Sequence, residues 1–197
     1  MDLPVVGTES AERADAARNR QRILEAAERL FTDRGVSCTS MDSIAAAAGV
    51  GKGTLFRRFG DRSTLALAVL DRTEQALQDS FLRGEPPLGP GAPPCRRLVA
   101  FGEAMLDNLE LNGEVLLDAE ISGAAGAYLR SAPHAVHWLH VRGLVREARP
   151  DCDADYISDL LLGPLSPQLF NHQRGSRGMS VGQLKAGYAD LVNRLLG

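Results

Sequence analysis

Apolar residues recur at intervals of three and four along most of the chain, in segments separated by glycine and proline. That spacing places them on one side of an α-helix, whereas a half-buried strand needs strict alternation, which no stretch shows. Residues 18–34 carry Ile23, Ala27 and Phe31 on one stripe, and Gly35 follows where a left-handed helix end is favoured. The sequence therefore predicts an all-α fold.

About nine helices are expected in total. After the first, they are predicted at about residues 40–48, 52–59, 61–83, 95–111, 113–124, 133–149, 153–170 and 180–196. The proline-rich run 85–94 is expected to be a loop, and Gly163, Pro164 and Pro167 should interrupt the helix predicted at 153–170 because proline breaks the helical hydrogen-bond ladder.

Composition narrows the class of protein. With 197 residues, 44% hydrophobic and 24% charged, the chain can bury a core without disulfides or metal. Its three cysteines are far apart and lack nearby histidines at zinc-ligand spacing. Because no stretch resembles a signal peptide or a membrane span, we expect a cytoplasmic protein with no membrane partner, no metal and no cofactor.

Charge is distributed unevenly along the chain. The formal net charge is −3, but residues 1–60 carry nine basic and eight acidic residues, and the remainder carries thirteen and seventeen. Basic residues gather between residues 49 and 62, where Lys52, Arg57, Arg58 and Arg62 are opposed by one carboxylate, that of Asp61. Such a local cluster matters more than the average for a protein that binds one DNA site.

Two short predicted helices, 40–48 and 52–59, are joined by a glycine-containing turn. A second helix with outward basic and hydroxyl side chains suits the major groove of DNA, where it can reach base edges. Periodicity alone leaves a second interpretation open, in which Arg57 and Arg58 only solvate the surface of a helical bundle.

The order and spacing of the residues in this region closely resemble the signature of the TetR family of transcriptional regulators. The resemblance is continuous over about fifty residues. Its anchors are Ile23-Leu24-Glu25-Ala26-Ala27, Leu30-Phe31, Gly35, Thr39-Ser40-Met41, Ile44-Ala45, Ala48-Gly49-Val50 and Gly51-Lys52-Gly53-Thr54-Leu55-Phe56-Arg57-Arg58-Phe59.

The resemblance implies three regions: a flexible arm at 1–17, a helix-turn-helix domain at 18–62, and a ligand-sensing and dimerisation domain at 63–197. It also implies roles for particular residues. Thr39 and Ser40 would bind phosphate, and Arg62 would touch the DNA backbone. The exposed positions of the recognition helix, which would carry specificity, are Gly51, Lys52, Gly53, Thr54, Phe56, Arg57 and Arg58.

This chain departs from the family at Phe56, where relatives usually have a tyrosine whose hydroxyl meets phosphate. Gly51 and Gly53 also weaken the recognition helix, by up to about 1 kcal/mol each relative to alanine. Ahead of the first helix, Arg13, Arg18, Arg20 and Arg22 could form a minor-groove arm, but interleaved acidic residues make a solvated tail an equal alternative.

The last predicted helix has apolar residues spaced for packing along one seam, at Val181, Leu184, Tyr188, Leu191 and Leu195. The seam could belong to the chain's own core, but the resemblance favours a homodimer interface. An unidentified small-molecule effector is expected to bind between the helix-turn-helix domain and the last helix. The residues expected to contact it are Phe101, Met105, Leu109, Leu116, Trp138 and Val141. Ordinary core packing is an alternative for each of them.

Two further clusters, one of acidic residues and one of histidines, could in principle bind a ligand. The acidic series 103–118 could attract a cationic effector or simply form a solvated helix face, which we favour. His134, His137 and His140 are expected to be surface or satisfied core residues, because steps of three drift around a helix and no acidic partner is evident.

The sequence has no phosphate-cradling loop, metal-ligand cluster or activated nucleophile that would indicate an enzyme. A protein-interaction adaptor is a further alternative, but it would give the residues of the family signature no function. The sequence therefore predicts a ligand-responsive repressor that binds a palindromic operator in double-stranded DNA as a homodimer.

Overall fold

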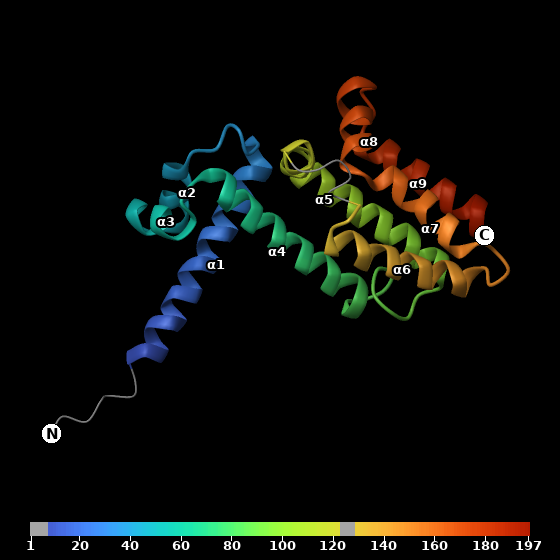
Figure 1. Ribbon diagram of the computed structural model, residues 1–197, viewed down its shortest axis with the longest axis horizontal. Helices are drawn as coiled ribbons and strands as arrows, with labels where there is room; N and C mark the ends of the chain where they lie inside the picture. The colour runs from blue at the N-terminus through green and yellow to red at the C-terminus, as the bar shows by residue number, and fades with distance from the viewer. Residues whose placement is uncertain (1–7, 123–128) are drawn as a thin grey trace. The chain divides into compact units, whose positions relative to one another are not determined.

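The computed structural model describes residues 8–122 and 129–197, with side chains described except those of residues 8–13, 114 and 117–122. Within these ranges the chain forms nine α-helices and no strand, as the sequence predicts (Figure 1). It divides into two compact units, residues 1–71 and 72–197. The division falls within a helix, whereas the expected domain boundary was at residue 62.

The first unit is built from three helices and the beginning of a fourth. Their bounds are α1 Thr8–Arg34, α2 Met41–Ala48, α3 Lys52–Phe59 and α4 Arg62–Arg83. Helix α1 begins ten residues earlier than predicted, so residues 8–17 of the expected flexible arm are helical. Residues 1–7 of that arm lie outside the described part of the chain.

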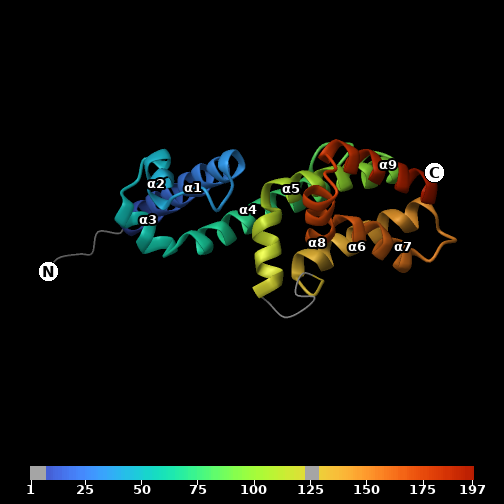
Figure 2. The same cartoon turned by 90° about the horizontal axis from the view of Figure 1, so that it is seen from above.

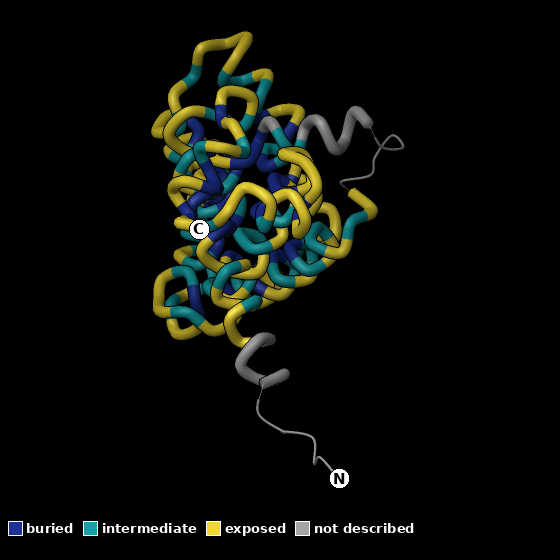
Figure 3. Tube along the Cα trace, turned by 90° about the vertical axis from the view of Figure 1, so that its left-hand side faces the viewer, coloured by how far each residue is buried: buried dark blue, intermediate teal, exposed yellow. Residues whose placement is uncertain are grey.

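The core of the first unit lies where the four helices face one another, and their outer faces are exposed (Figure 3). Helix α1 supplies the predicted stripe, and the shorter helices supply small or aromatic side chains that let them approach it closely. The buried side chains include Ile23, Leu24, Ala27, Phe31, Ile44, Ala45, Ala48, Leu55, Phe59, Leu65 and Val69.

The second unit contains the rest of α4 and the remaining helices. Their bounds are α5 Pro94–Ser122, α6 Ala132–Ala148, α7 Ala154–Leu162, α8 Pro167–Asn171 and α9 Val181–Leu196. Two short segments flank α8, namely the 3-10 turn Gly163–Leu165 (η1) and the π-helical turn His172–Ser176 (η2). Figure 2 shows α5 beside α9, and α6 beside α7.

Of two helix breaks predicted in this unit, one is confirmed and the other is absent from the structure. The interruption at Gly163-Pro164 is confirmed, since α7 ends at Leu162 and the chain continues as η1 and α8. The separate helices predicted at 95–111 and 113–124 are instead the single helix α5. Gly113 does not end it, because one glycine costs a helix only about 1 kcal/mol and packing against Phe170 can offset that loss.

Helix α5 occupies the centre of the second unit's core and packs closely against α9. The ring of Tyr188 lies where a side chain at Gly102 would have to be, so this contact requires glycine. The core also includes Leu98, Phe101, Met105, Leu106, Leu109, Val141, Leu144, Val145, Leu161, Leu165, Leu184 and Val192. Among the described residues, no helix has both the length and the apolar character needed to cross a membrane.

A polar cluster, partly buried, joins α4 to α6. The Nε2 atom of His137 lies 2.8 Å from Oε1 of Glu74, which also accepts a hydrogen bond of 2.7 Å from Nε2 of Gln78. The ring of His140 lies 4.4 Å from that of Phe81. His137 therefore has an acidic partner that was not evident from the sequence, because Glu74 is distant along the chain and faces it across the helix interface.

The environment of the cluster shifts the pKa values of His140 and Glu74 downward. Burial, with repulsion from Arg97 and His137, lowers the pKa of His140 to about 4. Burial alone would raise the pKa of Glu74, but the hydrogen bond and charge of His137, with Gln78, lower it below its ordinary value. His140 is therefore neutral at pH 7 and Glu74 is ionised.

This cluster predicts that the second unit loses stability in mild acid. Because His140 titrates near 6.5 when unfolded and near 4 when folded, the unfolded state binds protons first and stability falls as the pH decreases from about 6.5 to 4. Thermal unfolding at pH 7, 6 and 5 should show a falling Tm, and His140→Gln should flatten that slope. An equal slope in the variant would assign the pH dependence to other groups.

Candidate nucleic-acid interface

Helix α2 is capped at both of its ends, and a short turn joins it to α3 in a helix-turn-helix arrangement. The hydroxyl of Ser40 accepts a hydrogen bond of 3.1 Å from the backbone N–H of Ser43 at the start of α2. Gly49 ends α2 with φ +62°, a left-handed conformation in which its N–H donates to the carbonyls of Ala45 and Ala46. Gly51 is extended and leads directly into α3.

Helix α3 has two contrasting faces. Leu55 is fully buried and Phe59 is 6% exposed, so both fasten the helix to the unit's core. The opposite face is exposed and carries Lys52, Arg57 and Arg58. An eight-residue helix with a single anchored side must present the rest of its surface to solvent, and that surface is basic.

Two exposed residues of α3 contact each other and α2. The ammonium of Lys52 lies 2.7 Å from Oδ1 of Asp42 and 5.9 Å from the ring centroid of Phe56. The Lys52 and Asp42 side chains are both more than 60% exposed, so the ion pair contributes little stability and can exchange for another anion. Phe56 is 40% exposed, which places its ring on the same outer surface.

Thr39 lies differently from what the family resemblance implies. It is 1% exposed, and its hydroxyl donates hydrogen bonds to the carbonyls of Gly35 at 2.8 Å and Leu30 at 3.2 Å. The hydroxyl fastens the loop after α1 and is not presented to a phosphate, because burial without those bonds would leave it unsatisfied. The neighbouring Ser40 is exposed.

Arg62 connects the start of α4 to the loop before α2. Its Nη1 donates to the carbonyl of Ser37 at 2.7 Å and lies 3.4 Å from that of Thr39. Asp61 caps α4 by accepting a 2.8 Å hydrogen bond from the N–H of Thr64, and this bond lowers the pKa of the Asp61 carboxyl. Asp61 is thus the N-cap residue of α4.

Two arginines of α1 join this surface without having been assigned to it from sequence. Arg22 donates from Nη2 to the carbonyl of Gly49 at 3.3 Å, and the guanidinium of Arg20 lies 6.0 Å from the ring centroid of Phe59. The only sequence signal was their place among the arginines ahead of the first helix, because the pairing depends on how α1 crosses the turn.

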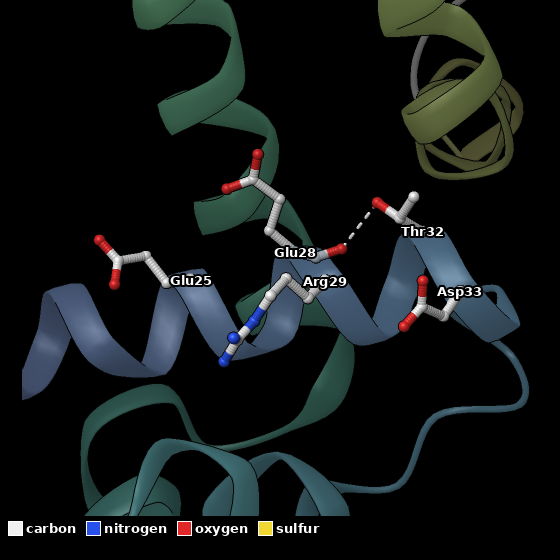
Figure 4. A pocket seen from close by; sticks show the side chains of 5 residues that line it. All are labelled: Glu25, Glu28, Arg29, Thr32 and Asp33. Atoms are coloured by element: carbon white, nitrogen blue, oxygen red, sulfur yellow. Dashed lines mark hydrogen bonds between the residues drawn. The ribbon is translucent and has the colours of Figure 1, made fainter.

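The opposite end of α1 carries a polar recess of about 470 Å³, lined by Glu25, Glu28, Arg29, Thr32 and Asp33 (Figure 4). Thr32 donates its hydroxyl to the carbonyl of Glu28 at 2.9 Å. Three carboxylates against one guanidinium would repel phosphate, so this part of α1 is unsuited to nucleic acid.

In the second unit, the residues expected to contact an effector lie in or against the core. Phe101, Met105, Leu109 and Val141 are buried, while Leu116 and Trp138 are partly buried. The indole N–H of Trp138 donates to Asp159 at 2.8 Å. In the described part of the chain, no group of three or more histidine, cysteine or acidic residues is arranged to hold a metal ion.

The expected seam of α9 is divided between the core and the surface. Leu184 and Tyr188 pack inside the chain's own core, whereas Val181, Leu191 and Leu195 are half-buried at its edge. Beside them runs a groove of about 290 Å³ between α5, η1 and α9. Its lining includes Leu106, Pro164, Leu165, Gln183, Gly187 and Leu191.

Residues 23–69 match a protein family described as bacterial regulatory proteins, tetR family. A curated HTH-type transcriptional regulator of Staphylococcus aureus is 50% identical over 60 residues, which are 30% of this chain and 32% of the relative. The chain therefore aligns with about a third of the length of that relative, and the aligned stretch is short.

Solved structures extend the similarity to most of the chain at the level of fold. A TetR-family regulator from Rhodococcus sp. has a TM-score of 0.63 at 16% identity, covering 92% of this chain and 100% of that one. A transcriptional regulator from Saccharomonospora viridis, solved in complex with choline, has a TM-score of 0.70 at 21% identity, covering 88% and 95%. The helix-turn-helix geometry and the match over residues 23–69 therefore identify the first unit as a DNA-binding domain of the tetR family of bacterial regulatory proteins, and the solved structures show that the rest of the chain shares the fold of such regulators.

Proposed function

We propose that the protein binds a palindromic operator in double-stranded DNA as a homodimer, represses transcription there, and leaves the operator when a small molecule binds its second unit. The observation that carries this proposal is the exposed basic face of α3, held outward by the burial of Leu55 and Phe59. A helix so presented fits the major groove.

Within the groove, Arg57 and Arg58 are the residues able to fork onto guanine O6 and N7, since a guanidinium offers paired donors. Lys52 can exchange Asp42 for phosphate. Gly53 supports a close approach of the backbone to DNA, because no heavy atom of the described residues lies within 4 Å of where its Cβ would be. The fold would accept alanine there, yet the less helix-favouring glycine is present.

One recognition helix reads only a few base pairs, so a second copy about 34 Å away would supply the remaining specificity. The half-buried side of α9 and the groove beside it offer apolar surface for that copy. On α7, Tyr156 and Leu160 are 69% and 42% exposed and share one helix face, which adds to the apolar surface available.

The second unit is the proposed effector site. Its polar cluster of Glu74, His137 and His140 lies close to Phe81 and Phe101, and such a mixture of aromatic and polar groups is typical of small-molecule sites. One solved structure of similar fold contains choline, so choline is the first compound to test.

Replacing both Arg57 and Arg58 by alanine should abolish operator binding, because two base-reading guanidiniums contribute about 1–3 kcal/mol each. The protein should remain folded and dimeric, since both side chains are exposed. Operator fragments selected from random DNA would be titrated at fixed salt, with sedimentation velocity reporting the oligomeric state. Arg177→Ala, an exposed arginine of the second unit, is the matched control and should bind as the unmodified protein does.

Phe56→Tyr should tighten operator binding by about fivefold to tenfold, because the ring is exposed on the reading surface and a hydroxyl could donate to phosphate, worth about 1 kcal/mol. The same titration measures the change. Unchanged affinity would mean that the ring of Phe56 does not approach the DNA backbone.

An effector that binds the second unit should weaken operator affinity by the same factor by which operator DNA weakens effector affinity, because the coupling is reciprocal. Trp138, the single tryptophan, can report effector binding by its fluorescence. Choline would be titrated with and without operator. A compound that binds the second unit but leaves operator affinity unchanged would contradict release by that compound.

A further inference from the structure

The N-terminal part of α1 extends beyond the helices that α1 packs against (Figure 1). Between residues 14 and 22 no residue is buried, whereas the next stretch, 23–31, supplies the core stripe. An isolated helix of this length is marginal in water, so a helix that continues without tertiary packing gains little from the fold itself. We call residues 14–22 the α1 extension.

Two contacts fix the direction in which the α1 extension leaves α2 and α3. Arg22 binds the carbonyl of Gly49 in the turn between α2 and α3, and Arg20 stacks over Phe59 at the end of α3. Both contacts lie at the point where α1 leaves the core. The extension therefore continues directly from the helix-turn-helix surface.

Charge on the α1 extension favours nucleic acid. It carries Arg18, Arg20 and Arg22 against one carboxylate, that of Asp15. Arg18 pairs with Asp15, but their side chains are 67% and 66% exposed, so the pair is weak and can exchange for phosphate. The recess on the C-terminal half of α1 is lined by three carboxylates and one guanidinium, so the α1 extension is locally more basic than that part of the helix.

From the geometry we infer that the α1 extension is a second DNA-contacting element, which binds backbone phosphates beside the base pairs that α3 reads. At about 1.5 Å per residue it spans roughly 13 Å, and duplex DNA offers a phosphate charge about every 1.7 Å of its axis. This inference rests on the proposed function. The contact carries no sequence information, because phosphates are the same along the duplex.

Arg18→Gln should lower the affinity for duplex DNA by about eightfold at 0.1 M salt and reduce the slope of log K against log salt by about 0.9, the value for one released counterion. The loss should be equal for selected operator and random duplex. Asp15→Asn should raise affinity, since it frees Arg18 and removes a repulsive charge. Arg18→Lys, which keeps the charge, should retain the salt slope of the unmodified protein.

The matched control is Arg29→Gln, an exposed arginine of the same helix in the acidic recess, which should change neither affinity nor slope. Circular dichroism verifies that helix content is retained in each variant. If Arg18→Gln leaves the slope unchanged, or if Arg29→Gln lowers it equally, the inference is overturned. If the unmodified protein binds no selected duplex at all, the proposed function itself fails.

Discussion

The burial of Leu55 and Phe59 beneath α3 is the constraint on which the exposed basic surface of that helix depends. These two side chains decide which side of an eight-residue helix is anchored, and thereby turn Lys52, Arg57 and Arg58 outward. Propensity could not do this, because α3 contains glycine and begins without a side-chain cap. The core of the first unit therefore both stabilises the helix and orients its chemistry.

Around that anchor, polar contacts divide into those that hold the fold and those that are free to exchange. The Thr39 hydroxyl is buried and bonds two carbonyls, and Arg62 bonds the loop before α2, so both fasten the scaffold. Lys52 is exposed and held by one surface carboxylate. The difference is desolvation: a buried polar group cannot leave its partner without penalty, whereas an exposed ion pair exchanges with water or phosphate at little cost.

In the second unit, closely packed helices surround a polar cluster. Gly102 lets α5 approach α9 until the ring of Tyr188 lies against the helix backbone. On the other side of α5, His137 and His140 pack against aromatic rings while Glu74 partners His137. Partial burial lowers the pKa of His140, so this part of the second unit is sensitive to protons.

Sequence by itself determined the local features: the helical class, the glycine-containing turn after α2, the break at Gly163-Pro164 and the family signature. Each follows from side chains a few positions apart. Tertiary structure alone decided the burial of Thr39, the placement of Arg20 and Arg22 beside the turn, the pairing of Glu74 with His137, and the continuity of α5. Those outcomes depend on which helices meet and how closely, and periodicity along one helix does not specify its neighbours.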